Sequence, residues 1–431
     1  MVFFCNNIWN IFKFLHNYRK KLMGATLSEP VTIKDTNAIR NEDYIVGSSC
    51  MQGWRLDMED AHTHILSLPD DKETAFFGVY DGHGGPNVSQ FAGLNLHKRI
   101  VQSEKFKSGN IEEGIIEGFI ALDEQMLNDE LMRKDTSGST AVTCLIKNNI
   151  LYTGNSGDSR AVASVNGCAI PLSYDHKPQN ASESRRIHEA GGFVEFSRVN
   201  GNLALSRALG DFCYKQAKDL PPSKQIVTVV PEVTVHELNK DFEFLIVACD
   251  GIWDVMSNQA AVDFVRAKLA DGLPPEEICE NMLDHCLSPD SKVEGLGCDN
   301  MTLIIVCLLQ GDTQEAFIQR VKRAADLTTI EKFDIKPEET EEYIPPEDSA
   351  TRRSAPSEQQ FIGSVEDIQQ IIASLRHGSL EQDVFRCLNV LSDESEDERV
   401  SNEREQDSAP QIFDVTKEDG KEEKTKEESK E

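Results

Sequence analysis

The chain has 431 residues, 39% of them hydrophobic, and is long enough for one large core or two smaller ones. Its 74 acidic and 44 basic residues give a net charge of −30, which excludes broad nucleic-acid binding because phosphate backbones attract the opposite sign. No segment reaches the roughly 20 consecutive apolar residues of a membrane-spanning helix.

Residues 1–42 are expected to form an N-terminal extension. The sequence MGATLS at residues 23–28 matches the M-G-x-x-x-[ST] pattern for N-myristoylation, which operates only if translation starts at Met23 and exposes Gly24. The alternative is a chance match, because the pattern is short. We therefore expect membrane contact only for a form that begins at Met23.

Residues 43–310 alternate apolar runs of strand length with amphipathic stretches of helix length, which indicates the globular body. Helices are predicted over 182–190, before a Gly-Gly pair, and over 258–269 behind a capping Ser257. The turns between successive β runs are too short for crossover helices, which favours antiparallel pairing and an α+β fold. The predicted strands are AVTCLI, LYTGNSG, AVASV, QIVTVV, FLIVAC and MTLIIV.

Residues 311–390 are predicted to be partly helical and to contain an acidic linker. A helix is expected over 316–327, and another over 364–375 has apolar residues on one face. That face is either packed against the protein or a groove for a partner. Residues 391–431 are predicted to be an acidic, disordered tail.

Four aspartates lie at the edges of the apolar runs. Asp81 follows FFGVY, Asp158 follows LYTGNSG, Asp250 follows FLIVAC, and Asp299 precedes NMTLIIV. Strands buried together would bring these carboxylates to one end of a sheet. Crowded carboxylates repel one another and raise each other's pKa, so the pattern predicts hard divalent cations with oxygen ligands between them.

Two segments near the start of the body add further polar groups. CMQGWRLDMEDAH contributes Arg55, Glu59 and Asp60, and VYDGHGG contributes Gly82 and His83. Carboxylate and carbonyl oxygens suit Mg²⁺ or Mn²⁺, and two such ions could activate water for hydrolysis. Arg55 has the forked shape that binds phosphate, and His83 could donate a proton to a leaving oxygen. Taken singly, each of these residues has a plainer interpretation as a turn former or an ion-pair partner.

Eight ordered blocks resemble the signature motifs of the metal-dependent protein Ser/Thr phosphatases of type 2C. They span roughly residues 43–310, which would form the catalytic domain, and eight blocks in order are more specific than any single motif. The resemblance implies a central β-sandwich of two antiparallel sheets flanked by α-helices, in α-β-β-α layers, with a small helical C-terminal appendage. The blocks are GWRLDMEDAH, FFGVYDGHGG, SGSTAV, GNSGDSRAV, LSYDHKP, RVNGNLALSRALGDF, ACDGIWDV and GCDNMT.

The resemblance also implies a role for each matching residue. Arg55 would bind the substrate phosphate and His83 would be the general acid. Residues 176–211 would correspond to a mobile flap beside the cleft. Two Mg²⁺ or Mn²⁺ ions are expected, with a weaker third. In the implied ligand set, Asp81 bridges both ions, the Gly82 carbonyl binds one, Asp250 and Asp299 hold the other, Glu59 and Asp60 act through water, and Asp158 joins Asp250 at the third.

The sequence therefore predicts a phosphatase that hydrolyses phosphoserine and phosphothreonine in proteins by direct attack of water. One alternative is a dinuclear hydrolase of small phosphoesters, and another is a regulatory module that binds phosphoproteins without turnover. We expect a monomer that binds no nucleic acid. The eleven cysteines form no C-x-x-C pair, and this pattern, with no export signal, favours the cytoplasm or the nucleus.

Overall fold

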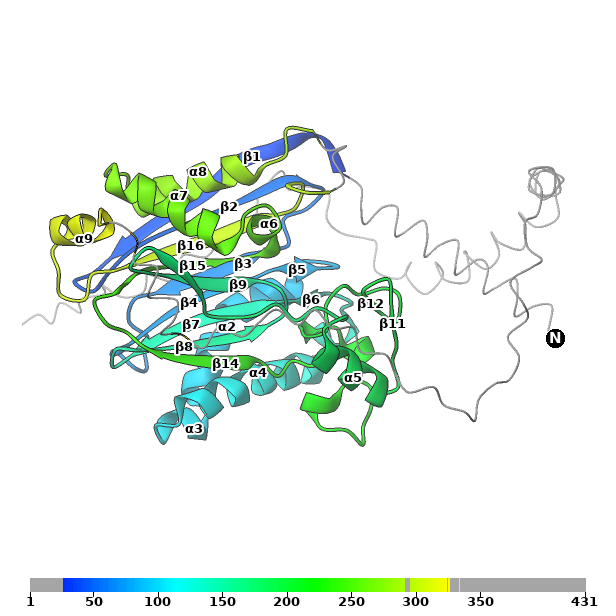
Figure 1. Cartoon of the computed structure of the whole chain (residues 1–431). Helices are drawn as coiled ribbons and strands as arrows, with labels where there is room; N and C mark the ends of the chain where they lie inside the picture. The colour runs from blue at the N-terminus through cyan, green and yellow to red at the C-terminus, as the bar shows by residue number, and fades with distance from the viewer. Residues whose placement is uncertain (1–25, 291–294, 324, 326–332, 334–431) are drawn as a thin grey trace, which may run out of the picture. The chain divides into compact units, whose positions relative to one another are not determined.

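The structure is a computed structural model of the whole chain, and it describes residues 26–290 and 295–323 together with residues 325 and 333. Two antiparallel sheets pack face to face, and helices cover both outer faces (Figure 1). The predicted α-β-β-α sandwich is therefore confirmed. Among the described residues, no helix is long and apolar enough to span a membrane.

The first sheet has six strands and begins before residue 43, because β1 pairs with β2 along most of its length. The expected boundary between an extension and the catalytic domain thus falls between two paired strands, and the domain division stays a prediction. In spatial order the strands are β1 (Thr26–Arg40), β2 (Tyr44–Arg55), β16 (Met301–Leu308), β15 (Phe242–Ala248), β9 (Arg160–Val165) and β10 (Cys168–Pro171).

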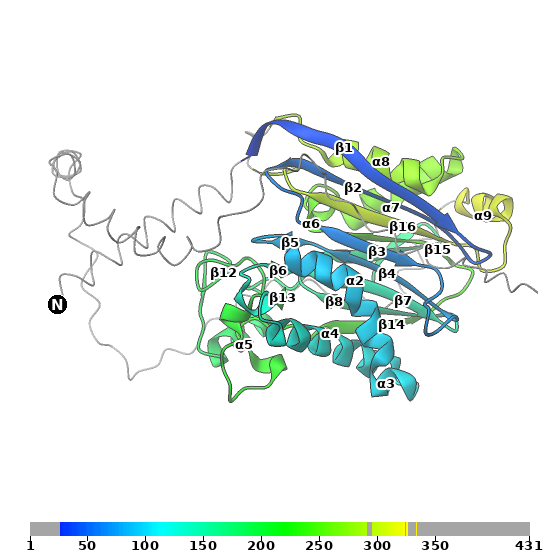
Figure 2. The same cartoon turned by 180° about the vertical axis from the view of Figure 1, so that it is seen from behind.

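The second sheet has five strands, and two groups of short strands lie beside it. The short strands and α5 gather at one end of the sandwich (Figures 1 and 2). The five strands are, in order, β14 (Glu232–Glu237), β8 (Ile150–Ser156), β7 (Ala141–Lys147), β4 (Thr74–Tyr80) and β3 (Ala61–Ile65). The short ones are β13 (Leu209–Gly210), β6 (Gly138–Ser139) and β5 (Gly82–His83) in one group, and β11 (Val194–Glu195) with β12 (Arg198–Val199) in the other.

Helices α7 and α8 cover the first sheet, whereas α2 and α4 cover the second. The predicted cap of α7 is confirmed, since the Ser257 side chain accepts from the Ala260 N–H at 3.3 Å. The helix predicted over 316–327 corresponds to the shorter α9. The helices are α2 (Asn87–Gln102), α3 (Glu104–Lys107), α4 (Ile111–Asn128), α5 (Ala181–Glu189), α6 (Asp250–Trp253), α7 (Asn258–Ala270), α8 (Pro275–Cys286) and α9 (Gln314–Val321). Short 3₁₀ turns cover Met132–Lys134, Phe212–Tyr214 and Pro222–Lys224.

The central strands are apolar throughout because both of their faces are buried. In β15, Phe244 and Ile246 face the helices α7 and α8, while Leu245 and Val247 face the second sheet. Successive side chains of a strand point to opposite faces, so a strand between two cores needs an unbroken apolar run. This is why the apolar runs FLIVAC and MTLIIV predict strands.

The predicted strand QIVTVV was wrong. Residues 225–227 form bends, Thr228 makes one isolated bridge with Arg207, and the strand β14 begins after Pro231. The Arg186 guanidinium takes up the carbonyls of Gln225 and Ile226, so these groups have no need of a neighbouring strand. An apolar run therefore showed burial here without showing sheet pairing.

Residues 23–25 of the N-myristoylation motif lie outside the described residues, whereas residues 26–28 begin β1. The predicted helix over 364–375 and the acidic tail also lie outside the described residues.

Candidate active site

Strand ends bring acidic side chains together at one end of the sandwich. Asp81 directly follows β4 and Asp158 lies two residues beyond β8, both in the second sheet. Asp250 lies two residues beyond β15, in the first sheet. One carboxylate oxygen from each of these three residues lies within 4.8 Å of the other two. The structure thus places together three of the four aspartates that the sequence singled out.

A second acidic group shares Asp81 with the first. Donor atoms of Asp60, Asp81 and Cys249 also lie within 4.8 Å of one another. One oxygen of Asp60 accepts from the Thr302 hydroxyl at 2.7 Å, and the other is buried with no hydrogen-bond partner among the described residues. Asp81 is therefore the common member of two adjoining groups. Nothing in the sequence indicated that the thiol of Cys249 would lie beside the carboxylates.

Asp299, the fourth aspartate, is paired with an arginine. Its carboxylate forms an ion pair with Arg55, which ends β2. The adjacent Asn300 holds the surrounding loops: its amide donates to the carbonyls of Gln52 and Asp57 at 2.8 and 3.0 Å, and it accepts from the Glu59 N–H at 2.9 Å. Asn300 therefore keeps the strand that carries Arg55 next to the loop that carries Asp299.

Gly82 lies where the chain passes closest to another backbone segment. A Cβ atom at this position would be 2.1 Å from the Glu59 carbonyl oxygen and 2.8 Å from the Ser89 hydroxyl. The Ser89 hydroxyl donates to that same carbonyl. Only glycine permits this approach, which sets the Glu59 and Asp81 segments side by side.

The acidic groups are costly to ionise in the absence of counter-charge. Burial raises the pKa of Asp60 to about 7, and the nearby Asp299 charge adds to the effect. Burial also raises the pKa of Asp81 and that of Asp250 well above the usual range, and each is raised further by neighbouring carboxylates. These side chains are thus held in a geometry that favours a bound cation or a proton over free charge.

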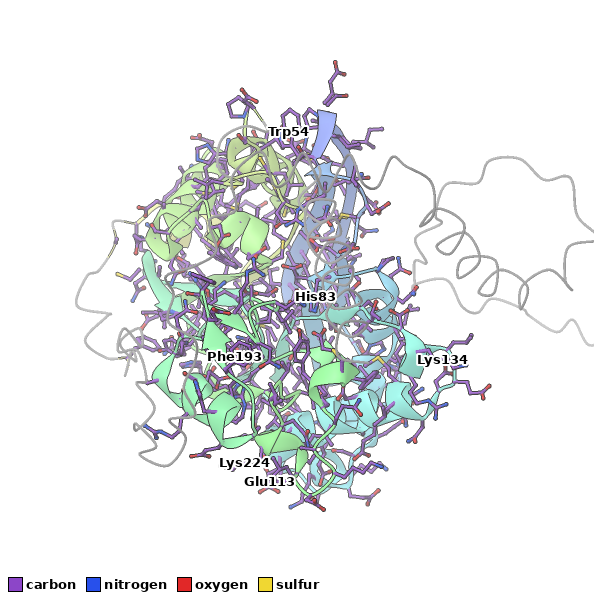
Figure 3. All side chains as sticks on the ribbon, turned by 90° about the vertical axis from the view of Figure 1, so that its right-hand side faces the viewer. Trp54, His83, Glu113, Lys134, Phe193 and Lys224 are labelled. Carbon is purple, nitrogen blue, oxygen red and sulfur yellow. The ribbon has the colours of Figure 1, made fainter. Side chains whose placement is uncertain are left out.

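The ring of His83 contacts Asp211, for which the sequence predicted no role in catalysis. His83 Nε2 lies 2.6 Å from an Asp211 carboxylate oxygen. Burial alone would lower the pKa of His83, but the charge and hydrogen bond of Asp211 outweigh it, and the pKa is raised. The sequence feature that could have indicated a role for Asp211 is its position directly after ALG in the block RVNGNLALSRALGDF. His83 lies near the middle of the face shown in Figure 3, between Trp54 and Phe193.

Lys177 is a second residue that sequence reasoning missed. Its ammonium group lies 2.5 Å from an Asp158 carboxylate oxygen, and the Asp158 side chain is 6% exposed. The neighbouring His176 fixes the same loop, since its ring accepts from the Gly157 N–H at 3.3 Å. Within residues 26–290 and 295–323, Asp158 is therefore the only carboxylate of the two acidic groups that forms an ion pair.

Residues 176–211 contain α5 and the hairpin of β11 and β12. Glu183 on α5 pairs with Arg186 at 2.6 Å and with Arg207 at 2.7 Å, which ties the helix to the chain that follows the hairpin. The mobility expected of a flap stays a prediction, but its base is joined by buried ion pairs.

Comparison with known proteins shows which family this chain resembles. A sequence model of the protein phosphatase 2C family matches residues 44–294. A probable protein phosphatase 2C of Caenorhabditis elegans is 57% identical over 312 residues, covering 72% of this chain and 88% of the other. Protein phosphatase 2C homolog 2 of Hypocrea jecorina is 51% identical over 313 residues, covering 70% and 72%.

Solved structures show the same fold. The crystal structure of a phosphatase from a pathogenic strain of Toxoplasma gondii matches with a TM-score of 0.55 and 25% identity, covering 64% of this chain and 96% of that one. The family model covers more than half of the 431 residues, and the acidic strand ends fall inside the matched range or directly beside it. This chain belongs to the protein phosphatase 2C family.

Proposed function

We propose that this family member hydrolyses phosphoserine and phosphothreonine esters of proteins by direct attack of a water molecule at a centre for two divalent metal ions. The observation that carries the proposal is the position of Asp81 in both acidic groups, one with Asp60 and the other with Asp158 and Asp250. A carboxylate shared in this way can bridge two cations.

The residues fit Mg²⁺ or Mn²⁺. The donors are mainly carboxylate oxygens, which hard cations prefer, and a buried Asp60 oxygen lacks a hydrogen-bond partner among the described residues. When bound, two such ions would lower the pKa of a water molecule and offset the charge of the phosphate. We propose that Asp81 and the Gly82 carbonyl, with Asp250 and Asp299, hold the ions directly.

Glu59 and Asp60 are proposed to act through water molecules that the ions retain. Asp158 is proposed to contribute with Asp250 to a weaker third position. The Lys177 ammonium already neutralises part of the Asp158 charge, which is a physical reason for that position to be the weakest. Support for these assignments comes from the two acidic groups and from the raised pKa of Asp81 and of Asp250.

Arg55 is proposed to bind the substrate phosphate. Its side chain is 42% exposed, at the rim of the acidic groups, and its ion pair with Asp299 fixes the side chain there. A guanidinium group can pair with a phosphate through two parallel N–H donors, which would hold the phosphorus in a fixed orientation. His83, 27% exposed, is proposed to donate a proton to the leaving serine or threonine oxygen.

The test is phosphate release from a phosphothreonine peptide and from p-nitrophenyl phosphate, with Mn²⁺ and with chelator. We expect Mn²⁺-dependent turnover of both substrates by the wild type, and loss of it in Asp81→Asn and Asp250→Asn. The control is Glu112→Gln, an exposed residue of α4 that should leave both rates unchanged.

Two outcomes would contradict the proposal. Turnover of p-nitrophenyl phosphate without turnover of any phosphopeptide would indicate a hydrolase of small phosphoesters. Binding of the phosphopeptide without turnover of either substrate would indicate a regulatory binding module.

A further inference from the structure

The contact between His83 and Asp211 is built by three short strands. In the sheet formed by β13, β6 and β5, His83 pairs with Gly138 from one side and Gly210 pairs with Gly138 from the other. Asp211 follows Gly210 directly. The register therefore brings the side chains of His83 and Asp211 together across Gly138, although 128 positions separate them in sequence.

Gly138 is the residue that leaves space for this contact. A Cβ atom there would lie 2.2 Å from the Asp211 carboxylate oxygen and 2.5 Å from His83 Nε2. Any side chain would therefore push the two groups apart, because such distances are well inside van der Waals contact. The absence of a side chain at Gly138 is what allows the 2.6 Å approach.

A second buried ion pair fixes the backbone on either side of Asp211. The N–H of Gly210 donates to Asp123 on α4 at 2.8 Å, and Asp123 pairs with Lys215 at 2.8 Å. The Asp123 and Lys215 side chains are 11% and 7% exposed, and Lys215 also donates to the Ala208 carbonyl at 2.8 Å. These contacts fix the chain on both sides of Asp211, so the carboxylate has little freedom to leave the His83 ring.

The backbone of Asp211 is also unusual. Its φ of +49° and ψ of +39° place it in the left-handed region, which aspartate tolerates better than most residues. The side chain is 6% exposed, compared with 27% for that of His83. Asp211 therefore combines a left-handed backbone with a buried carboxylate that faces a partly exposed imidazole. This arrangement costs free energy, and packing alone does not require it.

The geometry assigns the two ring nitrogens of His83 different tasks. Nε2 faces Asp211, which is the ring's one hydrogen-bond partner in the described part of the chain, so Nδ1 remains for a substrate. We propose that Asp211 is a positioning residue: it accepts from Nε2–H and holds the ring with Nδ1–H directed at the leaving oxygen. This inference rests on the proposed role of His83 as proton donor.

The proposed step is balanced. As water forms its new bond to phosphorus and the bond to the serine or threonine oxygen breaks, the Nδ1 proton passes to that oxygen. The imidazole keeps its Nε2–H on Asp211 throughout. The attacking water releases a proton to solvent, and the imidazole later takes one back from solvent at Nδ1.

The test uses two leaving groups in the full chain loaded with Mn²⁺. The alkoxide of phosphothreonine needs a proton to leave, whereas p-nitrophenolate does not. In Asp211→Ala we expect kcat for a phosphothreonine peptide to fall about 30-fold, a part of the roughly 10²- to 10⁴-fold that a general acid contributes. The kcat for p-nitrophenyl phosphate should change less than about threefold, and so should the KM of both substrates and the Mn²⁺ affinity measured by calorimetry.

Three further variants sharpen the result. Asp211→Asn keeps an acceptor oxygen and tolerates the left-handed backbone, so it should recover part of the lost peptide rate. Gly138→Ala leaves both side chains intact but separates them, and it should reproduce the selective loss; it also decides the matter if Asp211→Ala does not fold. The control is Asp219→Asn, an exposed aspartate farther along the same segment, which should have no effect.

His83→Gln separates this inference from the proposed function. If Asp211 acts through His83, adding Asp211→Ala to His83→Gln should not lower the peptide rate further. Equal losses on both substrates, or additive losses in the double variant, would overturn the positioning role while leaving the phosphatase activity established. A wild-type protein without peptide turnover would instead contradict the proposed function itself.

Discussion

Two groups of carboxylates in this protein have opposite electrostatic surroundings. Glu183, beneath the hairpin segment, is 2% exposed and lies between Arg186 and Arg207. Burial alone would raise its pKa, yet the two guanidinium groups outweigh it and hold the pKa far below the usual range. Asp60 is also buried and Asp81 is half-buried, but the pKa of each is raised by burial and by other carboxylates.

The difference separates a structural group from a functional one. Glu183 carries its counter-charges within the chain, so its ion pairs are complete once the protein has folded. The carboxylates at the strand ends have too few cations of their own, and they become stable as anions only when a cation arrives from outside. Asp158 lies between the two cases, because Lys177 supplies one positive charge.

The largest expected effect on stability comes from removing the charge of Glu183, whose ion pairs are complete within the chain. Glu183→Gln should lower the free energy of unfolding by about 3–5 kcal/mol, because it leaves the buried Arg186 and the partly buried Arg207 without a counter-charge. Urea unfolding with Mg²⁺ present measures this. Glu189→Gln, on the same helix but in a long, exposed contact with Lys224, should change stability by less than about 0.5 kcal/mol. Equal effects of the two substitutions would remove the contrast.

The next effect is a pH dependence confined to the metal-free protein. The pKa of Asp60 is about 7 in the folded state and lower in the unfolded chain. The contribution of Asp60 to the free energy of unfolding is therefore complete below about pH 4 and is lost as the pH rises through 7. In chelator, stability should therefore fall by about 2–3 kcal/mol between pH 5 and pH 8. Urea titrations at each pH measure it, and Asp60→Asn should flatten the curve. An unchanged slope in that variant would contradict the assignment.

A smaller effect is expected from removing one repelling charge. Asp250→Asn should raise the free energy of unfolding in chelator by about 1 kcal/mol, because it relieves repulsion among crowded carboxylates. The same variant should lose most of its Mn²⁺ binding by calorimetry. Destabilisation in chelator, as expected for Glu183→Gln, would show that Asp250 is already neutralised within the chain.

The smallest expected effect concerns Asp158, whose charge is partly offset by Lys177. Lys177→Gln removes a partly exposed ion pair and should cost less than about 1 kcal/mol in chelator. Because the charge of Asp158 is then no longer offset, the weakest Mn²⁺ site should bind roughly threefold to tenfold more tightly. Titration followed by electron paramagnetic resonance measures this, with the exposed Lys218→Gln as control. Weaker Mn²⁺ binding in Lys177→Gln would mean that the lysine supports the site.

The features that could be predicted from sequence are those that depend on neighbouring residues. FLIVAC and MTLIIV predicted buried strands because a strand between two cores must be apolar on both faces, and Ser257 predicted the start of α7. Asp81 and Asp250 could be selected because each follows such a strand. QIVTVV was misassigned because its carbonyls are satisfied by a distant side chain, that of Arg186.

By itself, the sequence determined the antiparallel α+β class and the acidic strand ends, since apolar periodicity and short turns are local properties. The layered sandwich was implied by the resemblance to a known family. Only the tertiary structure decided which charges meet: Asp211 with His83 across Gly138, Lys177 with Asp158, and two arginines with Glu183. The physical reason is that a carboxylate's pKa and its role depend on the charges within a few ångströms, and those charges come from distant parts of the chain.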